Sequence, residues 1–394
     1  MSEHRPRRVL VVFGTRPEAI KMAPLVLALK RVPHWSTLVA VTAQHREMLD
    51  QVLDVFGIRP AFDLDIMRPG QTLADITTRA LTGLEAVIAE AEPDIVLVHG
   101  DTTTTFAAAL SAFYRRIPVG HVEAGLRTYD KYAPYPEEMN RQLTGVLADY
   151  HFAPTEAAAQ ALIREGKPEA RVFITGNTVI DALSTTVRDD FRHPVLDAVR
   201  GRRMILLTAH RRENWGAPLW RIFTAVRRIV DAHPDVAVVY PVHLNPAVRE
   251  AADAALGDHP RVHLIPPLDV VAFHNLMARA FFILTDSGGI QEEAPALGKP
   301  VLVLREVTER PEGVAFGTLK LVGTDPEAIA REASVLLGDP EAYARMSGAT
   351  NPYGDGQASA RIVEALRYAF GEADRPPEPY RPQRTQNVHS SPDG

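Results

Sequence analysis

The chain has 394 residues, and at roughly 100–200 residues per domain this length predicts two or three globular domains. Hydrophobic residues make up 46% of the sequence, which is enough for a large buried core. The 43 basic and 49 acidic residues leave a net charge of −6. This charge argues against a general nucleic-acid-binding protein, because such proteins carry a basic face. The absence of cysteine excludes disulfides, thiolate metal ligands and cysteine nucleophiles.

No apolar run approaches the roughly 18 residues that a membrane-spanning helix needs. The basic N-terminus, residues 1–8, leads directly into a short strand-like run, which is too short for the apolar region of a signal peptide. From these features we expect neither a signal peptide nor a membrane partner, and we expect a cytoplasmic location.

Short apolar runs alternate with segments of helical spacing from one end of the chain to the other. In the first half, the runs that we interpret as buried strands are Arg8–Phe13, Leu38–Thr42, Asp94–Val98, Pro118–Val122, Tyr150–Ala153 and Val172–Thr175. After a charged stretch at 187–203 the pattern restarts with Met204–Thr208, Val236–Tyr240, Val262–Ile265, Phe281–Leu284, Val301–Leu304 and Leu319–Val322. Each set predicts a parallel sheet with helices on both faces.

We therefore predict an α/β fold with two Rossmann-like domains that face a central cleft. The expected boundaries are 1–190 and 191–372. A helical pattern covers Asp355–Phe370, and its apolar stripe leaves open a return onto the first domain. Residues 373–394 are rich in proline and polar side chains, which predicts a disordered tail.

The ligands of open α/β sheets bind beyond the carboxyl ends of the strands, so the residues that follow each predicted strand are the candidate site residues. The first strand leads into Thr15-Arg16-Pro17-Glu18. Arg16 and Lys21 then lie near a helix N-terminus, where an anionic ligand is favoured, although two solvated surface cations would give the same pattern. No GxGxxG motif is present at this position, so the dinucleotide fingerprint is missing.

Three carboxylates follow later elements of the first half. Asp101 and Glu123 come after consecutive strands, which are usually neighbours, and Glu137 opens a helix after a loop rich in tyrosine and proline. Helix capping and the helix dipole would explain each of them separately. Together at one edge they would raise one another's pKa, which suits acid and base work near neutral pH.

The second half carries histidines and a glycine turn in equivalent positions. His210 follows one strand beside two arginines, and His243 follows the next; either could contact a diphosphate or transfer a proton. The run Ser287-Gly288-Gly289 precedes a helix and exposes backbone N–H groups that can hold a phosphate. Glu293, one turn into that helix, could accept hydrogen bonds from both hydroxyls of a ribose.

Several ordered segments carry a resemblance to a known family. They are FGTRPEAIKMAPL (Phe13–Leu25), TAQHREMLDQVL (Thr42–Leu53), HGDTTTTFAAALSAF (His99–Phe113), IPVGHVEAGLRT (Ile117–Thr128), YPEEMNRQLTG (Tyr135–Gly145), TGNTVIDAL (Thr175–Leu183), TAHRREN (Thr208–Asn214), TDSGGIQEEAPALGKPVLVLR (Thr285–Arg305) and TERPEG (Thr308–Gly313). Over nearly its whole length, residues 9–369, the sequence resembles the non-hydrolysing UDP-N-acetylglucosamine 2-epimerases.

This resemblance implies a glycosyltransferase-B-like fold, a homodimer, and an activity that needs neither a redox cofactor nor a metal. The implied reaction interconverts UDP-N-acetylglucosamine and UDP-N-acetylmannosamine. UDP leaves by anti elimination across C1–C2, 2-acetamidoglucal remains in the closed site, and UDP adds back after a proton returns to the opposite face of C2.

The resemblance also assigns roles to individual residues. It implies that Asp101, Glu123 and Glu137 serve the proton transfers at C2, which is the catalytic set together with His210. The residues that it places on the UDP group are Arg16, Lys21, His210, Phe273 at the uracil, Ser287, Gly288, Gly289, Glu293 at the ribose and Arg310. We add His243 to this set because it follows the next strand after His210. Gln44 and His45 match a motif that binds a second, activating substrate molecule in some bacterial members, but Glu47 and Gly70 depart from it.

Other functions remain open at this stage. A relative could act on a modified substrate such as a 2,3-diacetamido uronic acid nucleotide, and residues 129–135 would decide this. A hydrolysing enzyme would release N-acetylmannosamine and UDP. A glycosyltransferase shares the fold and the glycine turn, but it leaves the three carboxylates without a clear task, and intact catalytic positions argue against a non-catalytic sensor of sugar nucleotides.

Overall fold

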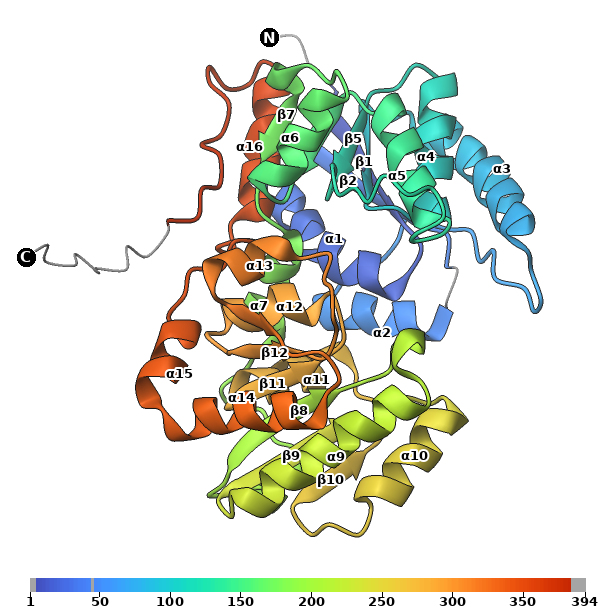
Figure 1. Ribbon diagram of the computed structural model, residues 1–394. Coiled ribbons are helices and arrows are strands. Elements are labelled where there is room, and N and C mark those ends of the chain that lie inside the picture. Colours follow the sequence, from blue (N-terminus) through green and yellow to red (C-terminus); the bar gives the residue numbers. More distant parts are fainter. Residues whose placement is uncertain (1–4, 44–45, 384–394) are drawn as a thin grey trace, which may run out of the picture. The chain divides into compact units, whose positions relative to one another are not determined.

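The computed structural model describes residues 5–43 and 46–383 of the chain (Figure 1). These residues form two compact units. The first unit runs to Thr185 and resumes with Tyr353–Arg381, and the second unit is Thr186–Pro352. The boundary at Thr185 lies near the expected 190, and the helical segment 355–370, whose return onto the first domain the sequence left open, belongs to the first unit.

The first unit is built on a seven-stranded parallel sheet in the order β3-β2-β1-β4-β5-β6-β7. Its strands are β1 (Arg7–Phe13), β2 (Trp35–Val41), β3 (Phe62–Asp63), β4 (Ile95–His99), β5 (Val119–Val122), β6 (Tyr150–Ala153) and β7 (Val172–Ile174). All six apolar runs predicted in this half form strands. The additional strand, β3, has two residues, which is too short for a periodic pattern to reveal.

Helices cover both faces of this sheet because its strands are buried on both sides. Its helices are α1 (Arg16–Lys30), α2 (Arg46–Phe56), α3 (Leu73–Ala91), α4 (Thr103–Tyr114), α5 (Glu137–Leu147), α6 (Glu156–Arg164), the 3₁₀ turn η1 (Glu169–Arg171), α7 (Thr178–Thr186) and α16 (Ala358–Ala369). On one face, α3 and α4 pack on Leu10, Val12 and Val96, and α4 contacts α5. Elsewhere in the unit, α1 contacts α2 and α16.

The segment after α16 is ordered further than its composition predicts. The Tyr380 side chain is only 7% exposed, and its backbone N–H donates to the Ile174 carbonyl at 2.8 Å. The Arg361 guanidinium lies 5.3 Å from the centre of the Tyr380 ring. The expectation of disorder from residue 373 is therefore wrong for the part around Tyr380, because this side chain is buried beside β7. Residues 384–394 lie outside the described part of the chain.

The second unit contains a six-stranded parallel sheet in the order β10-β9-β8-β11-β12-β13. Its strands are β8 (Arg203–Thr208), β9 (Val236–Pro241), β10 (Val262–Ile265), β11 (Phe282–Thr285), β12 (Val301–Val303) and β13 (Leu319–Leu321). Each predicted strand of this half is present, with its ends shifted by no more than one residue. The order of strands changes direction at β8, between β9 and β11, which is where open α/β sheets bind ligands.

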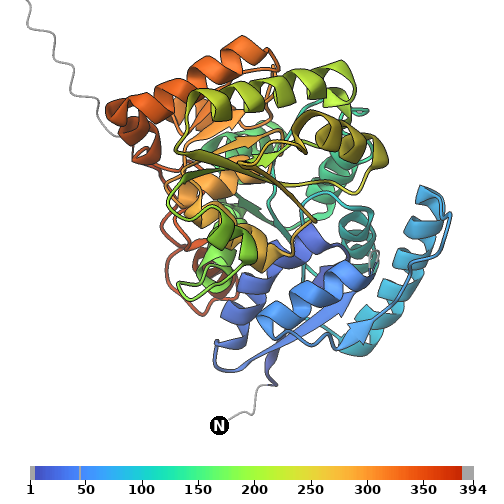
Figure 2. The same ribbon diagram turned by 90° about the horizontal axis from the view of Figure 1, so that it is seen from below.

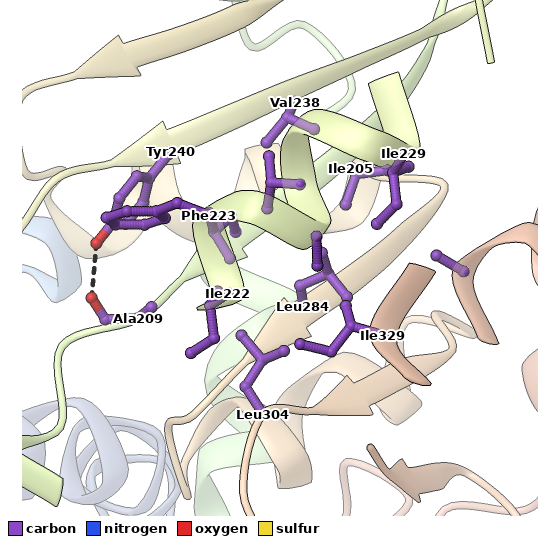
Figure 3. Packing of buried hydrophobic residues seen from close by; sticks show 14 of the residues in the cluster. Ile205, Ala209, Ile222, Phe223, Ile229, Val238, Tyr240, Leu284, Leu304 and Ile329 are labelled. Carbon is purple, nitrogen blue, oxygen red and sulfur yellow. Dashed lines mark hydrogen bonds between the residues drawn. The ribbon is translucent and has the colours of Figure 1, made fainter. Parts of the chain in front are cut away.

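The core of the second unit lies between its sheet and α9. The helices of this unit are α8 (Pro194–Ala198), the 3₁₀ turn η2 (Arg212–Asn214), α9 (Ala217–Ala232), α10 (Pro246–Leu256), α11 (Val270–Arg279), α12 (Ile290–Ala296), α13 (Pro311–Phe316), α14 (Pro326–Gly338) and α15 (Pro340–Ser347). Helix α9 packs against both α10 and α14 (Figure 2). Phe223 of α9 meets Tyr240 of β9 in this core, and the Tyr240 hydroxyl donates to the Ala209 carbonyl at 2.6 Å (Figure 3).

None of the helices within residues 5–43 and 46–383 is long and apolar enough to cross a bilayer.

Candidate functional site

Glu123 is the residue that directly follows β5. Its backbone has φ of 58°, a left-handed conformation that is uncommon for a residue with a side chain and occurs often at functional sites. The carboxylate is 9% exposed. Its Oε2 atom accepts hydrogen bonds from the Lys21 ammonium and from Asn177 Nδ2, the latter at 2.7 Å, and His99 Nε2 lies 3.7 Å away.

The neighbours of Glu123 stabilise its ionised form. Burial by itself raises the pKa of this carboxyl, but the positive charge of Lys21, with the His99 side chain, holds the pKa well below its usual range. Within residues 5–43 and 46–383, the hydrogen bonds to Glu123 all reach Oε2. The second oxygen, Oε1, is therefore left to accept a proton from a ligand.

Asp101 lies beside Glu123, as the sequence predicted, because β4 and β5 are paired with His99 opposite Val122. Burial raises the pKa of the Asp101 carboxyl; Arg141, whose Nη2 lies 2.8 Å from Oδ2, opposes the rise, and the negative charge of Glu123 adds to it. The two neighbouring carboxyls therefore have pKa values shifted in opposite directions.

The third predicted carboxylate, Glu137, is half-buried and is the first residue of α5. Asn140 and Arg141, three and four residues later, both contact Asp101: Asn140 Nδ2 donates to the Asp101 carbonyl at 3.0 Å. Residues at this spacing share one face of a helix, so Glu137 lies one turn away on the face that meets Asp101.

The adjacent acid, Glu138, has a structural task. It is fully buried and accepts hydrogen bonds from the backbone N–H groups of Thr128 at 3.1 Å and Tyr129 at 3.0 Å and from Gln142 Nε2 at 2.7 Å. It thereby fixes the tyrosine-rich loop that precedes α5. Glu137 and Glu138 are adjacent acids in the sequence, and only their burial and hydrogen bonds in the structure separate their tasks.

Glu18 joins the loop after β1 to the loop after β4. Its side chain is 2% exposed and accepts from the Thr15 backbone N–H at 2.8 Å and from the Thr102 hydroxyl at 2.7 Å. These contacts fix the start of α1, where Arg16 is the first residue, against the segment that carries Asp101. Lys21, which the resemblance assigns to the nucleotide, is in this structure the counter-ion of Glu123.

A different arrangement follows the strands of the second unit. Asp286, directly after β11, is fully buried. Its Oδ2 accepts from the backbone N–H groups of His210 and Arg211, each at 2.9 Å, and from Asn214 Nδ2 at 3.0 Å. Asp286 Oδ1 lies 3.5 Å from His210 Nδ1. This buried acid therefore organises the whole loop after β8.

The two predicted histidines of this unit lie together. The His210 and His243 rings are stacked at 5.5 Å with 8° between their planes. Burial lowers the pKa of His210, and the positive charges at His243 and Arg211 lower it further, while Asp286 opposes them. A bound anion would reverse this balance and favour the protonated ring.

The glycine turn lies against cations. A Cβ atom placed on Gly288 would be 3.5 Å from Arg211 Nη2 and 3.6 Å from Arg310 Cζ, so two guanidinium groups border this point. Arg310 is itself held by Glu292, with 2.6 Å between Nε and Oε1. The Ser287 N–H is already used, because it donates to Thr285 Oγ1 at 2.9 Å. The turn can therefore receive a phosphate at Gly288.

The predicted ribose-binding residue is also fixed by neighbours. Glu293 Oε2 accepts from His274 Nε2 at 3.1 Å, while His274 Nδ1 accepts from the Thr186 hydroxyl at 2.7 Å. Phe273, expected beside the uracil, is half-buried on α11, next to His274.

Sequence reasoning missed several residues of these sites. His99 and Asn177 contact Glu123, and Arg141 contacts Asp101. Arg211 borders the glycine turn, and Asp286 holds the loop after β8. Asp286 directly follows β11, and Asn177 lies three residues after β7, so both are near strand ends, the position that identified Asp101 and Glu123. The sequence around them does not show which distant side chains they contact.

Gln44 and His45, which were predicted to bind an activating substrate molecule, lie outside the described residues. Among residues 5–43 and 46–383 there is no group of three or more histidine, aspartate or glutamate side chains arranged to hold a metal ion.

Comparison with known proteins agrees with this chemistry. The family model described as UDP-N-acetylglucosamine 2-epimerase matches residues 27–367. The chain belongs to the UDP-N-acetylglucosamine 2-epimerase family. The UDP-N-acetylglucosamine 2-epimerase of Bacillus subtilis (strain 168) is 63% identical over 373 residues, which are 95% of this chain and 98% of that protein.

Solved structures of relatives share the fold. The UDP-GlcNAc 2-epimerase from Neisseria meningitidis, in a crystal structure bound to UDP-GlcNAc, is 50% identical with a TM-score of 0.83 and covers 92% of this chain and 100% of its own. The S. aureus MnaA–UDP co-structure is 54% identical with a TM-score of 0.88, over 95% of this chain and 100% of its own. The predicted α/β fold with two Rossmann-like domains is confirmed.

Proposed function

We propose that this chain is a non-hydrolysing epimerase that reversibly interconverts UDP-N-acetylglucosamine and UDP-N-acetylmannosamine. The observation that carries the proposal is the pair formed by Glu123 and Asp101, whose pKa values are lowered and raised, respectively. Neighbouring carboxyls with pKa values shifted apart can serve as base and acid in one reaction. The relatives described above, including one bound to UDP-GlcNAc, support the same substrate.

The proposed reaction begins with removal of the C2 proton by a carboxylate. The electron pair of the C2–H bond forms the C1=C2 double bond, and the C1–O bond breaks as UDP leaves with its electrons. In the return step a carboxyl group protonates the opposite face of C2 and UDP adds to C1. Substrate and product therefore contain the same atoms and differ only in the configuration at C2. Glu123 is suited to accept a proton and Asp101 to donate one, and Glu137 is the third member of this set.

The second unit supplies the groups that the leaving UDP requires. We assign Arg211, Arg310 and His210 to the negative charge of the diphosphate, with His243 beside His210. Gly288 and Gly289 would donate backbone N–H groups to a phosphate, Glu293 would accept from the ribose hydroxyls, and Phe273 would flank the uracil. Arg16 in the first unit is a further diphosphate contact. The homodimer, the cytoplasmic location, the absence of a nucleic-acid partner and the activating role of Gln44 and His45 remain predictions.

The deciding experiment is incubation of the purified protein with UDP-N-acetylglucosamine in deuterated water, followed by proton NMR. We expect UDP-N-acetylmannosamine with deuterium at C2. Free N-acetylmannosamine together with UDP would instead identify a hydrolysing enzyme. An unchanged substrate, with UDP binding intact, would refute the proposed function and favour a different sugar or a transferase.

A further inference from the structure

Asn177 lies between β7 and α7 and reaches the catalytic glutamate from a buried position. Its side chain is 3% exposed. Nδ2 donates to Glu123 Oε2 at 2.7 Å, and Oδ1 accepts from the Val179 backbone N–H at 3.1 Å. Its own backbone N–H donates to the Tyr353 carbonyl at 2.7 Å. Both ends of the amide and the backbone are therefore fixed, and the side chain cannot turn without breaking a buried hydrogen bond.

The consequence for Glu123 is a fixed carboxylate with unequal oxygens. Oε2 accepts hydrogen bonds from Lys21 in α1 and from Asn177, which directly precedes α7. Two donors on one oxygen prevent rotation of the carboxylate, so Oε1 keeps one direction. A group that removes a proton from carbon needs such a fixed direction, because small errors in geometry slow the transfer greatly.

We propose that Asn177 is a positioning residue for the proton transfer at C2: it fixes Oε2 of Glu123 so that Oε1 faces the reacting carbon, and it helps to keep Glu123 ionised. Asn177 acts through Glu123. This inference rests on the proposed function and adds a residue to its mechanism.

The identity of the side chain matters because an amide adds a donor without adding charge. Among the residues that the structure describes, the charged or titratable groups that face Glu123 are Lys21 from α1, His99 from β4 and Asp101 from the loop after β4. An aspartate at position 177 would have nearly the same shape and could still accept from Val179, so the start of α7 would be preserved. It would, however, place a second negative charge against Oε2, which favours the protonated form of Glu123.

The test is the pH dependence of turnover in Asn177→Asp. We expect the acidic limb of kcat/KM to move to higher pH by about one unit or more, and kcat at neutral pH to fall about tenfold to a hundredfold. The dissociation constant for UDP, measured by calorimetry, should stay unchanged. The apparent pKa values belong to the coupled pair, so the shift between variant and wild type is the quantity to compare.

Gln160→Glu is the matched control. Gln160 Nε2 donates to Glu156 Oε1 at 2.9 Å on the exposed surface of α6, so this variant also converts an amide that contacts a glutamate into an acid in the same unit. We expect its pH profile to match the wild type. A profile shifted as far as that of Asn177→Asp would assign the effect to added charge in general and overturn the inference.

Asn177→Ser decides the matter if the aspartate variant does not fold. Serine can cap α7 but is too short to reach Glu123, so we expect kcat to fall about tenfold with a smaller shift of the acidic limb. Folded variants with wild-type turnover and pH profile would overturn the role of Asn177 alone. A wild-type protein that incorporates no deuterium at C2 would instead overturn the proposed function.

Discussion

Glu123 and Asp286 are buried carboxylates that directly follow parallel strands, β5 in the first unit and β11 in the second. The two differ in their hydrogen-bond donors and in their exposure. Three donors reach Asp286 Oδ2, namely two backbone N–H groups and the Asn214 amide. Its Oδ1 atom is buried beside His210 Nδ1, at 3.5 Å, and accepts no hydrogen bond within residues 5–43 and 46–383. Glu123 has one oxygen held by two side chains and one oxygen free of protein hydrogen bonds within residues 5–43 and 46–383.

The difference shows how one topology supports two tasks. A buried carboxylate surrounded by backbone donors shapes a loop, because those donors would otherwise lose their hydrogen bonds. Both carboxylates are held through one oxygen, but the Glu123 side chain is 9% exposed and that of Asp286 is fully buried, so we expect only Glu123 to exchange a proton with a ligand through its second oxygen. We therefore expect the proton transfers in the first unit, while in the second unit Asp286 orders the loop that carries His210 and Arg211.

The largest expected effect comes from removing the reactive carboxylates. Asp101→Asn, Glu123→Gln and Glu137→Gln should each lower turnover about 10²- to 10⁴-fold, because general acid or base catalysis contributes factors of this size. UDP binding should survive in all three, since none of these carboxylates is among the UDP contacts that we propose. Deuterium incorporation at C2 and calorimetry with UDP measure the two properties separately. Wild-type turnover in all three variants would refute the catalytic assignment.

Asp286 should behave in the opposite way. Asp286→Ala leaves the N–H groups of His210 and Arg211 without their acceptor, so we expect the free energy of unfolding to fall by about 3 kcal/mol and UDP binding to weaken about tenfold or more. Asp286→Asn retains one acceptor oxygen and should show smaller losses of both. Urea denaturation and UDP titration provide the measurements. Normal UDP binding by a folded Asp286→Ala variant would show that this acid does not organise the anion site.

Gly288→Ala separates binding from stability within the second unit. The added methyl group would make ordinary contacts with Arg211 and Arg310, at 3.5 and 3.6 Å, so the free energy of unfolding should change by less than about 0.5 kcal/mol. The same methyl group would occupy the space that we assign to a phosphate, and UDP should bind about tenfold more weakly. Gly338→Ala, at the end of α14 with no atom within 4 Å of the added carbon, is the control and should leave UDP binding unchanged.

The smallest expected effect on stability at neutral pH concerns two buried histidines of the first unit, one in β5 and one in β6. Burial lowers the pKa of His121 to about 3 and that of His151 to about 4, whereas in an unfolded chain both titrate near 6.5. The unfolded state therefore binds more protons between these values, and stability that is complete above pH 6.5 is lost as the pH falls towards 4. Each histidine should contribute a slope of about 1.4 kcal/mol per pH unit.

His151→Leu provides the comparison for this prediction. Removing one of the two titrating groups should make the unfolding free energy less dependent on pH between 6.5 and 5, by about one proton's slope. Urea denaturation at several pH values, followed by circular dichroism, measures it. Identical slopes for variant and wild type would contradict the assignment of His151 as a buried neutral histidine.

The sequence by itself determined the α/β class and the position of twelve strands, because buried parallel strands appear as short apolar runs between helical segments. It also located Asp101, Glu123, His210 and the glycine turn, since strand ends and turns are local features of the chain. The ordered motifs identified the family.

Only the tertiary structure decided which side chains meet these residues. Asn177 is 54 positions from Glu123, and Lys21 is 102 positions away, so no local pattern could pair them. The same holds for the return of α16 to the first unit, the burial of Tyr380, and the division of labour between Glu137 and Glu138. Hydrophobic periodicity fixes where a strand or helix begins, but burial, charge and hydrogen bonding at a site depend on contacts between segments that are distant along the chain.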